Sequence, residues 1–170
     1  MPPRRRTPSA TPLRPAAAER RLRAELVEIG RRLHARDLVG AAEGNLSVRL
    51  GADRFLVTAS GVSKGHLGPD DLVVVDGRGQ VVAGRRRAST EVRMHLAAYA
   101  ARPDVAAIVH AHPITAVALT VAGAPPPSDL VPEAAVTLGP IAVAPFATPG
   151  TDEVPASLSP YLAGHDAVLL

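Results

Sequence analysis

Two histidines, His110 and His112, stand one residue apart at the end of an apolar run that begins at Val105. Side chains two apart in a strand project from the same face of a sheet. Both imidazoles can therefore approach one point, where each neutral ring offers a lone pair to a first-row cation such as zinc. The pair predicts two metal ligands at a strand end. The alternative is that both rings are buried in a polar network.

Glu91 is the candidate for moving protons. It directly follows Ser89 and Thr90, which can cap a helix that starts at this point. A carboxylate in this position could protonate or deprotonate a carbon or oxygen polarised by a cation. The alternative is that Glu91 only interacts favourably with the dipole of its own helix.

Three turns of small residues are candidates for anion binding. Glycine lets a ligand approach the backbone, and hydroxyls with free N–H groups at a helix start bind phosphate. Ordinary turn formation and helix capping are the alternative for each turn. The three turns are Gly44-Asn45, Ser60-Gly61 and Ser89-Thr90.

The elements that must position these residues follow from apolar periodicity. Leu22, Leu26, Ile29 and Leu33 are spaced by four, three and four residues, which predicts an amphipathic helix from residue 16 to about residue 37. Further helices are predicted at residues 91–101, 114–122 and 153–162. Strands are predicted at residues 46–50, 54–58, 72–75, 80–83, 105–111, 141–144 and 167–170.

The charge of the chain is concentrated at its start. The net charge is +3, but the first 18 residues contain Arg4, Arg5, Arg6 and Arg14 and no acid, so the remainder carries about −1. Without a basic face and with only 2% aromatic residues, the composition argues against nucleic-acid binding. Residues 1–15 are rich in proline and arginine, which predicts a disordered tail before one domain at residues 16–170.

Cysteine is absent, so neither disulfides nor thiolate metal sites are available. This suits a reducing compartment, and we expect a cytoplasmic protein. No apolar run approaches the roughly 20 residues that a membrane helix requires. We therefore expect neither a membrane nor a nucleic-acid partner, and the metal ligands must come from His, Asp and Glu.

Taken together, five blocks in order resemble the class II aldolase/adducin family, which includes L-fuculose-phosphate aldolase and L-ribulose-5-phosphate 4-epimerase. The resemblance extends from about Leu22 to Leu170. The blocks are Gly44-Asn45-Leu46-Ser47, Thr58-Ala59-Ser60-Gly61, Ala88-Ser89-Thr90-Glu91 followed by Met94-His95, Ala107-Ile108-Val109-His110-Ala111-His112, and Ala144-Pro145-Phe146-Ala147-Thr148-Pro149-Gly150-Thr151.

The resemblance implies an α/β fold, a three-layer α/β/α sandwich around a mostly antiparallel sheet, in a homotetramer with active sites between subunits. It implies that His110 and His112 bind zinc or another divalent first-row metal and that Glu91 is the acid/base. It also implies that Gly44, Asn45, Ser60, Gly61, Ser89 and Thr90 hold the phosphate of a small sugar phosphate. No Schiff-base lysine is required, so no role is predicted for Lys64.

One expected ligand is missing from the chain. The family's third metal histidine follows a strand like that at residues 167–170, where this sequence stops. His165 precedes the strand and is not predicted to be a ligand. Since natural domains rarely finish on four apolar residues, we expect that the chain is a fragment lacking the C-terminal part of the domain or that a partner covers its end.

The leading functional hypothesis is a metal-dependent aldolase-type lyase that cleaves or rearranges a small sugar phosphate through an enediolate. A cation bound beside the breaking bond stabilises the negative charge that develops there. A 4-epimerase or a sugar-phosphate dehydratase on the same scaffold is the second hypothesis. A non-catalytic adducin-like scaffold, or an inactive truncated relative, is the third.

Overall fold

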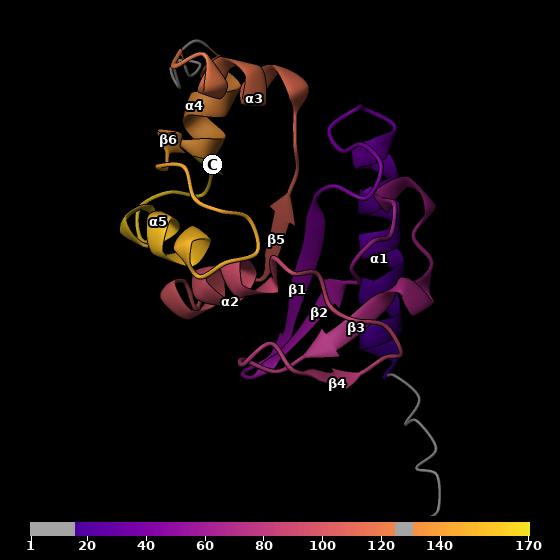
Figure 1. Ribbon diagram of the computed structural model, residues 1–170. Coiled ribbons are helices and arrows are strands. Elements are labelled where there is room, and N and C mark those ends of the chain that lie inside the picture. The colour runs from indigo at the N-terminus through magenta and orange to yellow at the C-terminus, as the bar shows by residue number, and fades with distance from the viewer. Residues whose placement is uncertain (1–15, 125–130) are drawn as a thin grey trace, which may run out of the picture.

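The computed structural model describes residues 16–124 and 131–170 (Figure 1). The tail expected at residues 1–15 lies outside this part of the chain. In chain order the elements are α1 (Ala17–His34), β1 (Asn45–Gly51), β2 (Arg54–Thr58), η1 (Lys64–His66), η2 (Pro69–Asp71), β3 (Leu72–Val75), β4 (Val81–Ala83), α2 (Val92–Ala101), β5 (Ala107–His110), α3 (Ile114–Val121), α4 (Pro132–Leu138), β6 (Ala142–Val143), α5 (Glu153–Leu162) and β7 (Val168–Leu169).

The central sheet has five strands in the order β4-β3-β2-β1-β5, and every neighbouring pair is antiparallel. Short turns join β1 to β2 and β3 to β4, whereas residues 59–71, which include η1 and η2, connect β2 to β3. β5 arrives after α2 and pairs with the free edge of β1. A separate parallel pair, β6 and β7, joins the last third of the chain.

Helix α1 covers one face of the sheet. Its apolar stripe, which includes Leu26, packs on the side chains that point toward it from the strands. Alternate residues of a strand project to opposite faces, so Leu46 and Val48 of β1 meet α1 while Ser47 faces away. Complete burial of a leucine side chain stabilises the fold by roughly 1.5–3 kcal/mol. The same apolar residues whose spacing predicted the helix therefore form this part of the core.

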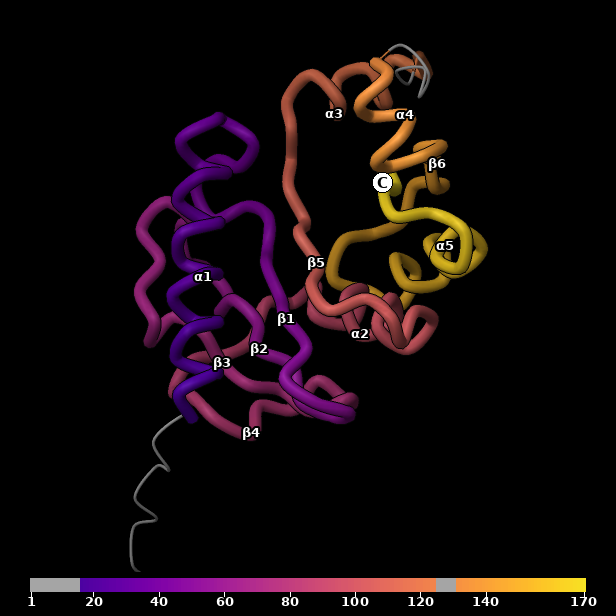
Figure 2. Tube along the Cα trace, turned by 180° about the vertical axis from the view of Figure 1, so that it is seen from behind, coloured from indigo at the N-terminus to yellow at the C-terminus, as the bar shows by residue number. Residues whose placement is uncertain are grey.

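Helix α2 covers the opposite face, and α5 packs on the outside of α2. Phe55 and Val57 of β2 contact a cluster that contains Tyr99 of α2. Met94 of α2 then packs with Leu158 of α5. Figures 1 and 2 show α1 on one side of the sheet and α2 with α5 on the other. The predicted three-layer α/β/α sandwich with a mostly antiparallel sheet is confirmed.

Several predicted boundaries differ from the observed ones. The strand expected at residues 105–111 is limited to β5, and Pro113 is the N-cap of α3. Helix α4 was not predicted, because its apolar side chains are mostly exposed and form no stripe. α2 begins at Val92, with Glu91 as its N-cap and no capping hydrogen bond from a side chain. The Ser89 hydroxyl instead accepts a hydrogen bond from the Glu91 N–H at 3.3 Å.

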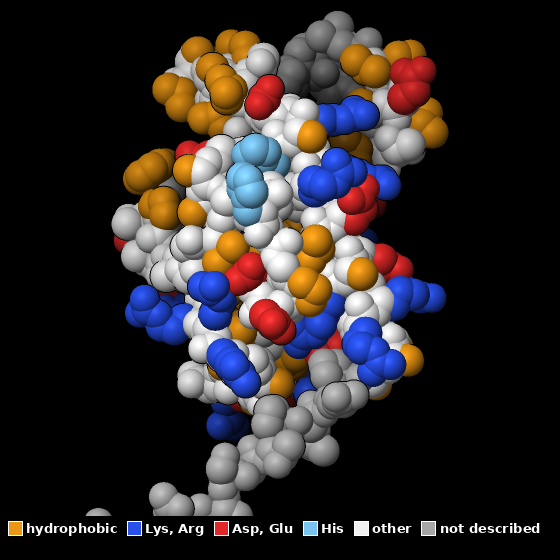
Figure 3. Space-filling view, turned by 90° about the vertical axis from the view of Figure 1, so that its right-hand side faces the viewer, with side chains coloured by type: hydrophobic (Ala, Val, Ile, Leu, Met, Phe, Trp, Pro, Cys, Tyr) orange, Lys and Arg blue, Asp and Glu red, His pale blue; other side chains and the backbone are white. Residues whose placement is uncertain are grey.

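Charges of both signs are interleaved on the face formed by α1 (Figure 3). Glu28 accepts hydrogen bonds from Arg31 and Arg32, which lie three and four residues further along the helix. Two histidines gather on this face as well, His34 and His66, with ring centroids 5.8 Å apart. Among the described residues, none of the helices is both long enough and apolar enough to cross a membrane.

Candidate active site

Strand register brings the first two site residues together. In the antiparallel pair β1–β5, Asn45 lies opposite His110, although 65 residues separate them in sequence. Gly44 precedes this pair with a φ of +68°, and a Cβ there would lie 2.6 Å from the His110 carbonyl oxygen. Glycine is thus required for backbone packing at this position, because no side chain fits between the two strands.

The carboxylate of Glu91 completes a cluster of three polar groups. Asn45 Nδ2 donates to Glu91 Oε2, and His110 Nδ1 lies 3.3 Å from the same oxygen. The hydrogen bond from His110, together with the one from Asn45, holds the pKa of Glu91 below its usual value against the opposing effect of burial. Glu91 is therefore kept ionised, which is the state required of a base.

His112 continues the same edge of the sheet. Its backbone N–H donates to the Leu38 carbonyl at 2.8 Å, so the residues after β5 are tied to the loop that follows α1. The ring lies against that of His110, with centroids 4.8 Å apart. Its Nε2 is buried and has no hydrogen-bond partner among the described residues. The two rings are therefore neighbours at one edge of the sheet.

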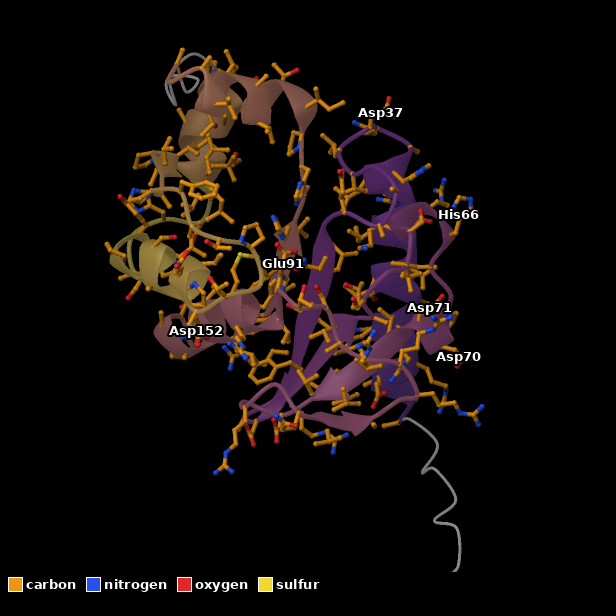
Figure 4. The ribbon with its side chains drawn as sticks, viewed as in Figure 1. Asp37, His66, Asp70, Asp71, Glu91 and Asp152 are labelled. Carbon is orange, nitrogen blue, oxygen red and sulfur yellow. The ribbon has the colours of Figure 1, made fainter. Side chains whose placement is uncertain are left out.

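A cavity of about 290 Å³ opens beside these groups. Glu91, His110 and His112 line one side of it. The opposite side comes from the C-terminal part of the chain, through α3, the 145–149 segment, α5 and the last three residues. Figure 4 shows Glu91 where the start of α2 meets β1 and β5, whereas the labelled Asp37, His66, Asp70 and Asp71 lie on the α1 side.

Two of the predicted anion-binding turns are neighbours in space. The Ser60 N–H donates to the Arg87 carbonyl at 3.0 Å, and the Ser89 N–H donates to the Thr58 carbonyl at 3.2 Å. These bonds run between the end of β2 and the segment that leads into α2. The Ser60-Gly61 and Ser89-Thr90 turns therefore lie side by side. Gly61 has a φ of +73° and open space around its Cα.

Thr90 and Ser89 also line a second, more open cavity of about 510 Å³. Arg87 and Arg93 stand on its rim, and Gly150 closes the far side, with its Cα hydrogens directed at Thr90. The Ser60-Gly61 turn lines neither cavity. Thr90 and Glu91 are neighbours in sequence, but Glu91 lines the first cavity and the Ser89-Thr90 turn lines the second.

The two histidines suit a metal ion by their chemistry. If His110 donates from Nδ1 to Glu91, its Nε2 keeps a lone pair, and such an outer carboxylate typically orients a metal-binding histidine. His112 Nε2 is buried and free of a hydrogen bond. Among residues 16–124 and 131–170, no group of three His, Asp or Glu side chains is placed to hold a metal ion. His165 hydrogen-bonds the Tyr161 carbonyl at 3.0 Å instead.

Two buried polar side chains near the site had no role in the sequence-based predictions. Lys64 lies in η1 and donates from Nζ to the carbonyls of Ala42 (2.9 Å) and Val62 (2.7 Å), and burial lowers its pKa. His95 lies one helical turn after Glu91 and is also buried. The spacing of four residues is the signal that could have identified His95, whereas a lone lysine in a predicted loop gives no such signal.

Comparisons with known proteins agree with this geometry. Residues 24–170 match the family model described as Class II Aldolase and Adducin N-terminal domain. Methylthioribulose-1-phosphate dehydratase from Pseudomonas savastanoi pv. phaseolicola is 38% identical over 99 residues, which are 58% of this chain and 48% of the relative. 5-Methylthioribulose-1-phosphate/5-deoxyribulose-1-phosphate aldolase from Rhodospirillum rubrum is 36% identical over 149 residues, 88% of this chain and 66% of the relative.

Among solved structures, YgbL from Klebsiella pneumoniae, a candidate aldolase/epimerase/decarboxylase, superposes with a TM-score of 0.82 and 32% identity. The match covers 89% of this chain and 75% of YgbL. Against the dehydratase, in contrast, the matched part of this chain spans about half of the relative's length. The segment that matches the family model contains Glu91, His110, His112 and all three turns of small residues. The chain therefore belongs to the class II aldolase and adducin family.

Proposed function

We propose that this chain is a metal-dependent lyase of the class II aldolase type that acts on a small sugar phosphate. The observation that carries the proposal is the contact of the Glu91 carboxylate with His110 and Asn45 beside a cavity that Glu91, His110 and His112 line. A base, an amide and two imidazoles at one cavity are the groups that such a reaction requires.

His110 and His112 would hold the metal, zinc or another divalent first-row cation. When bound, such an ion supplies a Lewis acid that offsets negative charge on a substrate oxygen. The protein's own part is to orient the rings. Glu91 holds the Nδ1 side of His110, and the His112 N–H bond to Leu38 anchors the backbone that carries the second ring.

Glu91 would take a proton from the substrate or return one to it. Its carboxylate is ionised and borders the cavity, and Asn45 and His110 restrict its orientation. A positioned acid/base of this kind contributes about 10²- to 10⁴-fold to the rate. The Oδ1 of Asn45 is buried and has no hydrogen-bond partner among the described residues, while the Nδ2 of the same amide donates to Glu91.

The substrate phosphate would be held by the small-residue turns. The Ser60, Ser89 and Thr90 hydroxyls and the open backbone at Gly61 can donate to phosphate oxygens. Gly44 and Asn45 would complete the phosphate-binding surface next to Glu91. Support comes from the names of the two relatives, which both act on a pentulose 1-phosphate.

Dehydration is the second candidate reaction. It is favoured by the similarity to the Pseudomonas dehydratase, while the aldolase relative matches a larger part of this chain. Aldol cleavage removes the proton of a substrate hydroxyl group and breaks a C–C bond, so that this hydroxyl becomes an aldehyde. Dehydration removes a proton from the carbon beside the carbonyl and breaks a C–O bond, so that water leaves. Product analysis with 5-methylthioribulose 1-phosphate separates them, because only the aldolase reaction shortens the carbon chain.

A Glu91→Gln variant tests the proposal. We expect turnover of a panel of 5-methylthioribulose, 5-deoxyribulose and L-fuculose 1-phosphates to fall by about 10²-fold or more, with the metal content unchanged. Glu25→Gln is the matched control, since Glu25 is an exposed helical glutamate on α1, and it should retain full activity. Equal turnover in Glu91→Gln and wild type would rule out the assigned role.

Metal analysis separates the enzyme from a non-catalytic scaffold. The purified chain should carry about one zinc or similar ion, and His112→Ala should lose most of it. Fewer than about one ion per ten chains would favour the scaffold. A homotetramer in the cytoplasm belongs to the same proposal, and sedimentation of the purified chain tests the assembly.

A further inference from the structure

Helix α2 and strand β1 face each other along a line of polar side chains. Three residues of α2 at a spacing of four lie opposite three residues of β1 at a spacing of two. Four helical residues advance by about 6.0 Å and two strand residues by about 6.6 Å, so the two series stay in step. The members are Glu91, His95 and Tyr99 on α2 and Asn45, Ser47 and Arg49 on β1.

Contacts join the two series at every step. Asn45 bonds Glu91 at the first step. At the second, the Ser47 hydroxyl lies 2.6 Å from His95 Nδ1 and 2.8 Å from the Tyr99 hydroxyl. At the third, Arg49 Nη2 donates to the Tyr99 carbonyl at 2.9 Å, and its guanidinium lies 4.7 Å from the centre of the Tyr99 ring. Glu91 belongs to the first of these three polar steps, which repeat along the line where α2 lies on β1. Among the described residues His95 Nε2 has no hydrogen-bond partner, so this ring does not hydrogen-bond the first step to the second.

The middle of this line is fully inside the protein. His95 and Tyr99 are each 2% exposed and Ser47 is 0% exposed. Burial lowers the pKa of His95 to about 3, so its ring is neutral and the contact with Ser47 is an ordinary hydrogen bond. Buried polar groups cost free energy unless they are paired, and apolar side chains would fill the same space without that cost. Unlike apolar packing, a hydrogen bond requires a defined orientation of the two groups that form it.

The segment that leads into α2 is held by the bond of the Ser89 N–H to the Thr58 carbonyl, and Val92 packs on the core, but neither contact fixes the direction of the Glu91 side chain. Glu91 is the N-cap residue, and no side chain caps the helix. Its backbone N–H donates to the Ser89 hydroxyl at 3.3 Å. A small rotation or slide of α2 over β1 would therefore move the Glu91 carboxylate away from His110 and Asn45.

We propose that Ser47, His95 and Tyr99 are positioning residues, which fix the rotation and register of α2 on β1 and thereby hold Glu91 against His110. They touch no part of the cavity and act through Glu91. The effect on catalysis rests on the function proposed above, whereas the effect on the position of Glu91 does not.

Kinetics of Ser47→Ala and Tyr99→Phe test the effect on catalysis. Ser47→Ala removes both middle contacts, so we expect kcat to fall by about 10- to 100-fold with KM changed less than about threefold. Tyr99→Phe removes one contact farther from Glu91 and keeps the ring, so its loss should be smaller. Leu26→Ala, on the α1 side of the sheet, is the control for destabilisation alone and should keep the wild-type kcat below its unfolding temperature.

Nuclear magnetic resonance of the imidazole nitrogens gives a readout that does not require activity. In the metal-free chain, the Nδ1 resonance of His110 should shift in Ser47→Ala, shift less in Tyr99→Phe and stay unchanged in Leu26→Ala, because Nδ1 faces Glu91. If Ser47→Ala and Tyr99→Phe leave both kcat and this resonance unchanged, the positioning role is wrong. If wild type turns over no sugar phosphate while the resonance shifts as expected, the proposed function fails and the positioning role stands.

Discussion

The sheet region, residues 17–110, and the C-terminal region, residues 111–170, bury their apolar side chains to different extents. Among the described residues after His110, only Ala144 and Leu158 belong to the buried hydrophobic set. Phe146 is 91% exposed and Val136 is 87% exposed. In the sheet region, both faces of β2 and β3 are covered, by α1 on one side and α2 on the other.

The difference in burial divides the candidate site into two parts, one built from well-packed elements and one built from elements with few buried side chains. Glu91, His110 and Asn45 come from the sheet region, where strand pairing and two packed faces restrict them. Most of the other residues that line the cavity come from the C-terminal region, where few side chains are buried. The proposed base Glu91 and one proposed metal ligand, His110, therefore lie in the more buried region, whereas His112 and the rest of the cavity lining lie in the C-terminal region.

Substitutions of apolar side chains should show the difference between the two regions most clearly. Leu56→Ala, in the centre of the sheet, should lower the free energy of unfolding by about 2–5 kcal/mol, because it leaves a cavity beneath α1. Val136→Ala on α4 should change it by less than about 0.5 kcal/mol, because the side chain is exposed. Urea unfolding of both variants gives the two values, and similar losses would show that α4 is packed as firmly as the sheet.

Glycine-to-alanine substitutions compare how tightly the backbone is packed in the two regions. Gly44→Ala places a methyl group in the left-handed region and against the His110 carbonyl, so we expect a loss of about 3 kcal/mol. Gly164→Ala in the C-terminal region meets nothing within 4 Å and should be neutral or stabilise slightly. Thermal unfolding checks both changes, and a neutral Gly44→Ala would contradict the close approach of the two strands.

Acid should weaken the sheet region through His95. Its folded pKa of about 3 lies below the usual 6.5, so its contribution is complete above pH 6.5 and is lost as the pH falls toward 3. The reason is that the unfolded chain then binds a proton that the folded chain does not, with a slope of about 1.4 kcal/mol per pH unit. Urea unfolding between pH 7 and pH 5 measures this slope. In His95→Gln the slope of the free energy of unfolding against pH should be smaller by the amount that one bound proton contributes. An unchanged slope would mean that His95 has the same pKa in the folded and unfolded chains.

The smallest effect is expected for the ion pair that links the two regions. Arg93 of α2 donates to Asp152 at 2.8 Å, but the Asp152 side chain is 84% exposed. Solvent and salt screen such pairs, so Asp152→Asn should cost less than about 0.5 kcal/mol. A loss above about 1 kcal/mol in chemical unfolding would indicate that charge, rather than the contact of Met94 with Leu158, holds α5 on α2.

Much of the fold could be predicted because an element that packs against its neighbours carries a regular pattern of apolar residues in its sequence. The ranges 54–58, 72–75 and 153–162 agree with β2, β3 and α5 to the residue. α4 escaped prediction because its exposed apolar side chains make no periodic pattern. The fold class and the family were confirmed, while the roles of the site residues remain predictions that the experiments above test.

The sequence by itself determined which residues could do chemistry and on which local elements they stand, because periodicity and turn residues act over a few positions. It placed His110 at the end of a strand and Glu91 at a helix start, whereas the expectation that His112 shares a strand face with His110 is wrong because β5 ends at His110. Only the tertiary structure decided that Asn45 meets Glu91 across 46 residues and that Lys64 and His95 are buried nearby. Such contacts depend on strand register and on how α2 packs against β1, which no local pattern in the chain encodes.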